Sequence, residues 1–374
     1  MSTLLSQGGF GCVFYPGLDC DKSNGELNKK TVTKIQKDNF FSKKESHIGK
    51  KILRIPNYIE HFVPISETCQ IQIRKIEDKK FKKDIKKCEI ISEQSKLPYV
   101  SMSMKYINGK GLLDLFDDLD QDNRIIISKL MSSYYHLLTG IEILQQNGII
   151  HNDLKSDNVL FDLDSQLPKI IDFGISIEKE KLTDENLKDY FYAFGPEYFV
   201  WPIEVHIICY LLHEMPESFT EEMLHEIVRD HVEANKTYDD KIKMKKKCIQ
   251  SLKKFIGNKS KHIINELLKM SKTWDNYALS IMFLRILRTS LKEKDDNVFF
   301  EQFDDLLTMN ASPDFSERKS ILETRIKFNE LKDLNIKPLE YDKIIKTLNR
   351  TDSKKELVGD SIQLETIKEK YIKL

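Results

Sequence analysis

The stretch IIHNDLKSDNVLFDLDSQLPKIIDFG, residues 149–174, decides the fold of this chain. Within it, two short runs of β-branched and apolar residues flank a polar turn at 162–166, and this pattern predicts a β-hairpin. Asp153 and Asn158 precede the hairpin and Asp172 follows it, so all three are expected at the same end. The sequence therefore predicts two carboxylates and a carboxamide gathered in neighbouring loops.

This set of side chains suits phosphoryl transfer. The reaction needs a base that orients a hydroxyl and oxygen ligands that hold Mg²⁺ against the phosphates. Asn158 and Asp172 carry the hard oxygen ligands that Mg²⁺ prefers. The alternative is a polar turn in an unrelated α/β domain.

The motifs that contain these side chains, H-N-D-L-K-S-D-N and D-F-G, resemble the H-R-D-L-x-x-x-N and D-F-G motifs of protein kinases. The resemblance implies that Asp153 is the catalytic base and that Lys155 steadies the γ-phosphate. It further implies that Asn158 and Asp172 are metal ligands.

Residues 5–13, LSQGGFGCV, resemble the kinase glycine-rich loop, with Ser6 in place of the first glycine. Glycines let backbone N–H groups approach phosphates without a Cβ in the way. A dinucleotide-binding G-x-G-x-x-G would need a helix after its last glycine, whereas residues 13–15 continue as a strand. The resemblance assigns the whole loop to nucleotide binding: Leu5, Ser6, Gln7, Gly8, Gly9, Phe10, Gly11, Cys12 and Val13.

Residues 31–35, TVTKI, alternate as a strand and resemble the kinase V-A-I-K motif, in which Lys34 would reach the α- and β-phosphates. Glu45 lies on a predicted helix with Ile48 and Ile52 at helical spacing. The family pairs such a glutamate with the strand lysine. Only eleven residues separate Glu45 from Lys34, which is fewer than in most kinases.

The resemblance also supplies an adenine site. Residues 105–109, KYING, resemble the hinge M-E-Y-x-x-G, so backbone groups at Lys105 and Ile107 would bind adenine and Met104 would be the gatekeeper. The remaining apolar contacts assigned to the nucleotide are Val13, Val32 and Leu160.

Helical spacing of apolar residues predicts a long helix over 124–146, ended by Asn147 and Gly148. Residues 195–204, GPEYFVWPIE, resemble G-T-P-x-Y-x-A-P-E with one extra residue, which favours Glu204 as the buried glutamate. The kinase D-x-[WY]-[SA] pattern is matched only at Asp275 and the three residues after it. Residues 206–270 are therefore expected to be an insertion.

The insertion is predicted to be helical. Residues 218–221, SFTE, read as a capping box for a helix through Val232, followed by helices at 241–256 and 262–270. Nine lysines and no acid occur between Lys241 and Lys261, with an apolar stripe on one side. Two interpretations stay open, a solvated surface and a docking surface for an acidic partner. The stripe consists of Ile242, Ile249, Leu252 and Ile256.

The composition excludes several classes. Basic and acidic residues balance at 59 each, so overall charge does not indicate nucleic-acid binding. No apolar run approaches the ~20 residues that span a bilayer, and the N-terminus lacks signal-peptide features. The six cysteines form no C-x-x-C pair, so reduced thiols in the cytoplasm are expected rather than a zinc site or disulfides.

These observations predict an α+β, bilobal protein-kinase-like fold. The small β-rich N-lobe would span 1–107, the helical C-lobe core 108–290, and a C-terminal helical part with a charged tail 291–374. The expected activity is transfer of the γ-phosphate of Mg·ATP to Ser or Thr hydroxyls of protein substrates. A small-molecule kinase of the aminoglycoside or choline type and a pseudokinase scaffold are the alternatives.

Asn152 replaces the arginine of H-R-D. In kinases with that arginine, it meets a phosphate on the activation segment and orders the segment. Asn152 carries no charge, so we expect activity without such a phosphate. This departure and the insertion resemble the divergent kinases of large DNA viruses, which would place the protein in the host cytoplasm or the virion.

Overall fold

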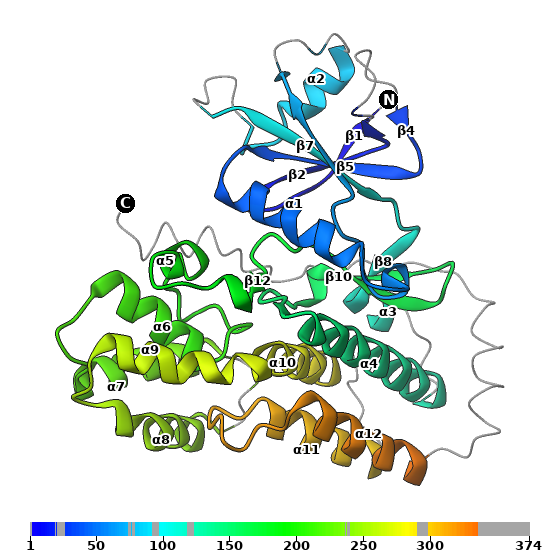
Figure 1. The fold of residues 1–374 in the computed structure, drawn as a ribbon. Coiled ribbons are helices and arrows are strands. Elements are labelled where there is room, and N and C mark those ends of the chain that lie inside the picture. Colours follow the sequence, from blue (N-terminus) through cyan, green and yellow to red (C-terminus); the bar gives the residue numbers. More distant parts are fainter. Residues whose placement is uncertain are drawn as a thin grey trace.

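The computed structural model describes residues 2–18, 20, 27–73, 76, 79–91, 97–117, 123–235, 237, 240–289 and 298–335. They form a smaller lobe around a β-sheet and a larger helical lobe beneath it (Figure 1), which confirms the bilobal α+β prediction. Across these residues, no helix combines the length and apolarity that a bilayer crossing requires.

The N-lobe sheet is antiparallel, with strand order β1-β2-β5-β7-β6. The first two strands form a hairpin over the glycine-rich turn, closed by a bond from Gly8 N to Gly11 O of 2.9 Å. Two short strands, β3 and β4, pair separately. The bounds are β1 (Thr3–Gln7), β2 (Gly11–Tyr15), β3 (Gly17–Leu18), β4 (Leu27–Asn28), β5 (Thr31–Lys37), β6 (Glu67–Ile71) and β7 (Tyr99–Lys105).

Two helices accompany the sheet, α1 (Phe40–Ile52) and α2 (Lys79–Ile85). The carboxamide of Asn39 caps α1 by accepting from the backbone N–H groups of Phe41 and Ser42, and the Ser42 hydroxyl accepts in return from Asn39 N. The predicted helical spacing is correct, since Ile48 and Ile52 are buried with Glu45 on the same face. That face points Glu45 toward β5.

Residues 59–75 have the apolar spacing of a strand and are predicted as one, but the first half of this segment is not a strand. A 3₁₀ turn (Tyr58–Glu60) comes first, and strand β6 begins only at Glu67. The intervening apolar residues are buried between the lobes, where Val63 N donates to Ile170 O at 3.0 Å. Apolar spacing alone does not distinguish a buried crossing segment from a strand. Residues 74 and 75 lie outside the described part.

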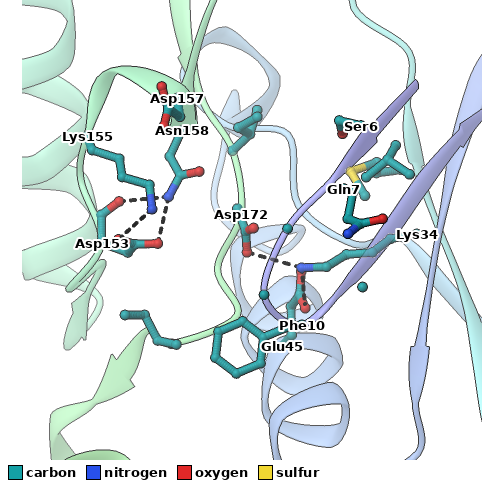
Figure 2. Close-up of a pocket in the computed structure, with 17 residues that line it drawn as sticks. Ser6, Gln7, Phe10, Lys34, Glu45, Asp153, Lys155, Asp157, Asn158 and Asp172 are labelled. Atoms are coloured by element: carbon teal, nitrogen blue, oxygen red, sulfur yellow. Dashed lines mark hydrogen bonds and ion pairs between the residues drawn. The ribbon is translucent and has the colours of Figure 1, made fainter. Parts of the chain in front are cut away.

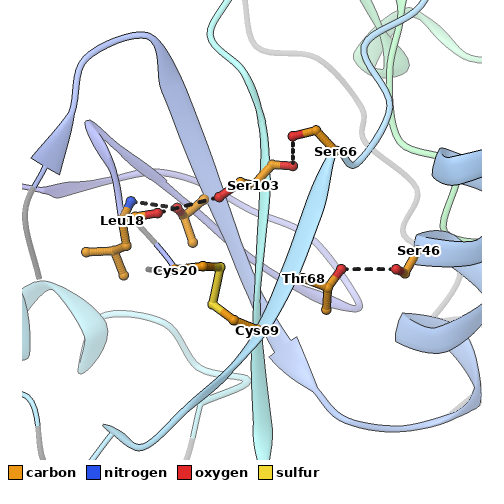
Figure 3. The surroundings of a disulfide bond; sticks show 8 residues. Leu18, Cys20, Ser46, Ser66, Thr68, Cys69 and Ser103 are labelled. Carbon is orange, nitrogen blue, oxygen red and sulfur yellow. Dashed lines mark hydrogen bonds between the residues drawn. A yellow bond between two sulfur atoms is a disulfide. The ribbon is translucent and has the colours of Figure 1, made fainter. Parts of the chain in front are cut away.

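The expectation of reduced cysteines is also wrong for the N-lobe. Cys12 is bonded to Cys88 and Cys20 to Cys69, with Cα–Cα distances of 6.1 and 5.8 Å. Figure 3 shows the second bond beside β7, whose Ser103 side chain donates to Leu18 O. The partners are 76 and 49 residues apart in sequence, so no short motif announces them.

Helices from the later part of the C-lobe pack against α4, which carries nearly all of its predicted apolar positions into the core. Tyr134 on this helix packs its ring against Phe283, Phe303 and Phe328 from three later helices. The helices are α3 (Leu112–Asp117), α4 (Asn123–Gln146), α5 (Leu187–Tyr190), α6 (Ile203–Glu214), α7 (Glu221–Ala234), α8 (Lys241–Leu252), α9 (Ser260–Leu268), α10 (Trp274–Thr289), α11 (Val298–Asn310) and α12 (Ile321–Asn335).

The predicted hairpin is formed by β10 (Val159–Asp162) and β11 (Leu167–Ile170), with β8 (Gly109–Gly111) on the other side of β10. Asp162 holds the turn, because its side chain accepts from Asp164 N at 3.0 Å and from the Ser165 hydroxyl at 2.7 Å. A second pair, β9 (Ile149–Ile150) and β12 (Ile177–Glu178), brackets the catalytic stretch. The two loops that carry the predicted site therefore emerge side by side.

The insertion differs from its prediction in detail. Thr220, not Ser218, caps α7, because its hydroxyl accepts from Met223 N. Helix α8 ends at Leu252, and a 3₁₀ turn and a loop with Gly257 at φ 79° precede α9. The predicted apolar stripe is therefore broken: Leu252 is buried, but Ile242 is 72% exposed.

Candidate active site

A cavity of about 480 Å³ lies between the lobes, lined by 17 residues (Figure 2). Most of the residues predicted from the sequence meet there, although they come from segments far apart in the chain. The predicted residues that line it are Ser6, Gln7, Gly8, Gly9, Phe10, Gly11, Val13, Lys34, Glu45, Met104, Asp153, Lys155, Asn158 and Asp172.

Six predicted nucleotide-binding residues are not part of this lining: Leu5, Cys12, Val32, Lys105, Ile107 and Leu160. For Cys12 the reason is the alternation of side chains along a strand. Gly11 and Val13 face the cavity, whereas Cys12 faces the opposite side, where it is fully buried in the N-lobe core and bonded to Cys88. Leu5, by contrast, is 58% exposed.

Lys34 lies at the centre of a buried ionic group. Its Nζ contacts Glu45 Oε1 at 2.9 Å and Asp172 Oδ1 at 3.1 Å, which joins β5, α1 and the D-F-G loop. Burial opposes the charge of Lys34, but Asp172 and Glu45 outweigh it and raise the pKa of the lysine. Burial also disfavours the Asp172 carboxylate, yet the lysine and Gly174 N–H lower the pKa of Asp172. The uncertain pairing of Glu45 with Lys34 is thus present despite the short connection.

Asp153 is held on both carboxylate oxygens. The Asn158 carboxamide donates to Oδ2 at 2.8 Å and to the backbone oxygen of Asp153 at 2.8 Å. Lys155 Nζ lies 3.5 Å from Oδ1, and the phenol of Tyr198 donates to the same oxygen. Asp153 lines the cavity with Lys155 and Asn158, so a fixed carboxylate faces the space in which a substrate would lie.

Three hydrogen bonds from Asp275 and Trp201 hold the backbone of the catalytic loop. Asp275 on α10 accepts from His151 N at 2.7 Å and from Asn152 N at 2.9 Å, and Trp201 Nε1 donates to Asn152 O at 2.7 Å. Asn152 has a φ of 65°, in the left-handed region that few residues other than glycine adopt. These three bonds stabilise that conformation and so set the position of Asp153.

Glu204 is fully buried and makes a bidentate pair with Arg318, at 2.7 and 2.9 Å. The guanidinium also lies 4.9 Å from the centre of the Tyr277 ring. In such a planar two-bond pair both hydrogen bonds are charge-assisted, and the matching planes of the two groups fix their relative orientation. The pair connects α6 to the segment before α12, and no local sequence pattern indicated Arg318 as the partner.

The donor set fits a divalent cation. The nitrogen of the Asn158 carboxamide is bonded to Asp153, so its carbonyl oxygen is directed away from Asp153. Asp172 has a φ of 57°, and its side chain is 38% exposed within the cavity lining. Both residues line the same cavity, and a carboxylate and a carbonyl oxygen are the hard ligands that Mg²⁺ binds together with phosphates.

Sequence reasoning missed several residues at the site. Asp157, Ile171 and Ile175 line the cavity, and Tyr198 reaches Asp153 from below. Asp157, Ile171 and Ile175 lie within or next to the predicted motifs, so their proximity to the motifs was a usable signal. The contact between Tyr198 and Asp153 spans 45 residues and had no local signal.

Comparison with known proteins agrees with this geometry. A family model described as the protein kinase domain matches residues 81–272, just over half of the 374 residues. A CBL-interacting serine/threonine-protein kinase 8 of Arabidopsis thaliana is 30% identical over 93 residues, which cover 25% of this chain and 19% of that protein. A serine/threonine-protein kinase of Candida albicans is 32% identical over 91 residues, covering 21% and 7% of the two chains.

The lobes, the cavity and the family match together define the class: this chain belongs to the protein kinase family. It spans about a fifth or less of the length of the relatives named here. The matched residues include the catalytic loop and the D-F-G motif and begin after Lys34 and Glu45. The family match therefore does not include the N-lobe residues of the site, and their assignment rests on the contacts described above.

Proposed function

We propose that this protein transfers the γ-phosphate of Mg·ATP to Ser or Thr hydroxyls of proteins. The observation that carries the proposal is the meeting of Lys34, Asp153 and Asp172 in one cavity, with Lys34 paired to Glu45. The lysine pairing and the loop aspartates are the parts that phosphoryl transfer in a protein kinase requires. The named relatives are serine/threonine kinases, which supports the acceptor class.

In this proposal Asp153 orients the acceptor hydroxyl and accepts its proton as the oxygen attacks the γ-phosphorus. Lys155 lies 3.5 Å from Asp153 and steadies the transferred phosphoryl group. Lys34 binds the α- and β-phosphates, and Glu45 keeps its ammonium group in place. Asn158 and Asp172 would hold Mg²⁺, which neutralises charge on the phosphates when bound.

The adenine site remains a proposal from the family resemblance. Val13 and Met104 line the cavity, which supports the assignment of Val13 as an apolar contact of the nucleotide and of Met104 as the gatekeeper. Val32 and Ile107 are buried and Leu160 is half-buried, outside the lining. The hinge backbone at Lys105 and Ile107 would bind the base edge, and Leu5 would cover it from above.

Incubation of the full chain with labelled ATP and Mg²⁺ tests the proposal, with peptides that present one Ser, Thr or Tyr each. Label on Ser and Thr peptides is expected, and Asp153→Asn protein excludes a contaminating kinase. Label on choline or an aminoglycoside alone would indicate a small-molecule kinase. ATP binding with no transfer to any acceptor would indicate a pseudokinase scaffold.

We further propose that the activation segment is ordered without phosphorylation. Glu178 in β12 contacts His47 at 2.8 Å and Lys51 at 2.7 Å, both on α1, and Lys181 at 3.2 Å. Burial would raise the pKa of Glu178, but bonds from Lys51, Lys181 and His47 lower it to about 2. This stabilisation is therefore present above the unfolded pKa of ~4.3 and is lost only as the pH falls toward 2. A permanent carboxylate thus occupies the role that a phosphate has in other kinases.

Phosphatase-treated protein is therefore expected to keep most of its kinase activity. Glu178→Gln should lower kcat/KM by roughly 10-fold, because three basic groups lose their shared anion and α1 is held less firmly. Glu180→Gln, an exposed neighbour, is the matched control. Loss of most activity on dephosphorylation would contradict the proposal, as would equal effects of the two substitutions.

The lysine-rich segment remains a proposed docking surface for an acidic protein. Lys243, Lys246 and Lys253 are exposed, whereas Lys247 is paired with Glu317 at 2.7 Å. Helix α8 packs on α7 at the end of the C-lobe away from the N-lobe (Figure 1), so it is remote from the cavity. Docking there would change the affinity for the protein substrate and not the rate of phosphoryl transfer.

Changing Lys243, Lys246 and Lys253 to Glu is expected to raise KM for an acidic protein substrate several-fold and to leave a short neutral peptide unaffected. The difference should shrink with added salt, because the Debye length falls from ~10 Å at 0.1 M to ~3 Å at 1 M. The same charge change at the exposed Lys29, Lys30 and Lys327 is the control. Equal effects on both substrates would reject the docking surface.

The proposed domain division keeps 1–107, 108–290 with its insertion at 206–270, and 291–374. The end of β7 at Lys105 and the pairing of β8 with β10 support the first boundary. The described part of the last segment, α11 and α12, packs against α10 and α4. The charged tail lies outside the described residues.

Two narrower proposals concern the nearest kinase group and the cellular location. The likeness to kinases of large DNA viruses rests on Asn152 and on the insertion. A cytoplasmic location is proposed from the sequence alone, and the two N-lobe disulfides count against it, because cytosolic thiols are normally kept reduced.

A further inference from the structure

Tyr198 contacts Asp153, the proposed catalytic base, and has been given no role in the proposed activity so far. Its side chain is almost completely buried, at 1% exposure, and it does not line the cavity. Its hydroxyl donates to Asp153 Oδ1, and Lys155 Nζ lies 3.4 Å from the same hydroxyl. The phenol therefore touches both groups that are proposed to act on the acceptor and the phosphoryl group.

The two oxygens of Asp153 are held from two directions. Asn158 donates to Oδ2 within the catalytic loop, and Tyr198 donates to Oδ1 from the segment 195–201. A carboxylate held at one oxygen can still turn about its side-chain torsions. A second bond at the other oxygen fixes the plane of the carboxylate, and with it the direction of the lone pairs that face the cavity.

The phenol is itself rigidly held. Its ring packs edge-on against Trp201 at 5.3 Å between centroids, and the Trp201 indole donates to Asn152 O at 2.7 Å. Lys155 Nζ lies 5.6 Å from the Tyr198 ring centre. Burial, together with the neighbouring Asp153 carboxylate, raises the pKa of Tyr198, so the hydroxyl stays protonated and remains a donor.

We propose that Tyr198 is a positioning residue for phosphoryl transfer, which orients the Asp153 carboxylate toward the acceptor hydroxyl. The segment 195–201 would thereby act on the base through this bond. The proposal rests on the proposed kinase activity. It also explains why a buried polar group is directed at Asp153 from outside the cavity.

Tyr198→Phe tests this, because it keeps the ring and its packing and removes the donor alone. A lost bond to a charged group is expected to lower kcat roughly 10- to 100-fold. The Kd for ATP should stay within about twofold, because Tyr198 does not reach the cavity. Incorporation of 4-aminophenylalanine at position 198 returns an N–H donor to the same place and should restore most of kcat.

Tyr134→Phe is the matched control, since Tyr134 is a fully buried tyrosine in the core of the same lobe, remote from Asp153. It should leave kcat unchanged and report how far loss of a buried phenol affects the melting temperature. A wild-type kcat in Tyr198→Phe would overturn the proposal. So would a parallel loss of ATP affinity, or failure of the amino variant to restore kcat. If wild-type protein transfers no phosphate, the proposed function fails, and this is seen without any variant.

Discussion

Asp153→Asn is expected to lower the rate of phosphoryl transfer by roughly 10²- to 10⁴-fold, the range that general-base groups contribute. Asparagine keeps the shape of the side chain and can still bond to its neighbours, but it cannot accept the proton of the acceptor hydroxyl. The Kd for ATP should stay close to that of the wild type. In the structure, Asp153 contacts Asn158, Lys155 and Tyr198, whereas Lys34, the residue proposed to bind phosphates, is paired with Glu45 and Asp172.

The measurement combines kcat from labelled ATP with ATP affinity from calorimetry. Asp164→Asn is the control, because Asp164 is an exposed aspartate in the nearby hairpin turn and the change removes the same charge. A variant at position 153 that keeps most of its kcat would show that another group serves as the base.

Asp172→Ala is expected to abolish the part of ATP affinity that depends on Mg²⁺. Asp172 is one of the two residues proposed as metal ligands in the cavity lining, and it also contacts Lys34 at 3.1 Å. Loss of the cation's charge stabilisation should lower kcat by roughly two orders of magnitude or more. Removal of Asp172 leaves Lys34 with Glu45 at 2.9 Å, so the lysine keeps a partner and the fold is expected to persist.

The test is to measure the Kd for ATP both in excess Mg²⁺ and in the presence of a metal chelator. In the wild type the two values should differ widely, and in Asp172→Ala they should converge. A melting temperature near that of the wild type shows that the variant is folded. If Mg²⁺ strengthens ATP binding equally in both proteins, Asp172 is not a metal ligand.

The proposed catalytic centre could be predicted from the sequence because its parts are encoded locally. The hairpin between Asn158 and Asp172 follows from two β-branched runs around a polar turn, and short-range bonds inside the stretch then fix the loops. The same holds for the glycine turn of the first hairpin and for the burial of Ile48 on α1. Periodicity and motif spacing are properties of a few consecutive residues, so a single sequence displays them.

Tertiary structure alone decided the partners that hold this centre in place. Glu204 meets Arg318 across 114 residues, Glu178 meets His47 across 131, and Cys12 meets Cys88 across 76. Asp153 and Tyr198 are 45 positions apart, and no local sequence pattern indicated their contact. Even within α8, the spacing of Ile242 and Leu252 suggested one buried face, yet only Leu252 is buried. The physical reason is that a charge can pair with many different partners or stay in solvent, and a thiol or an apolar side chain can pack against many different neighbours. Only the packing of the helices and the sheet decides which group comes within reach.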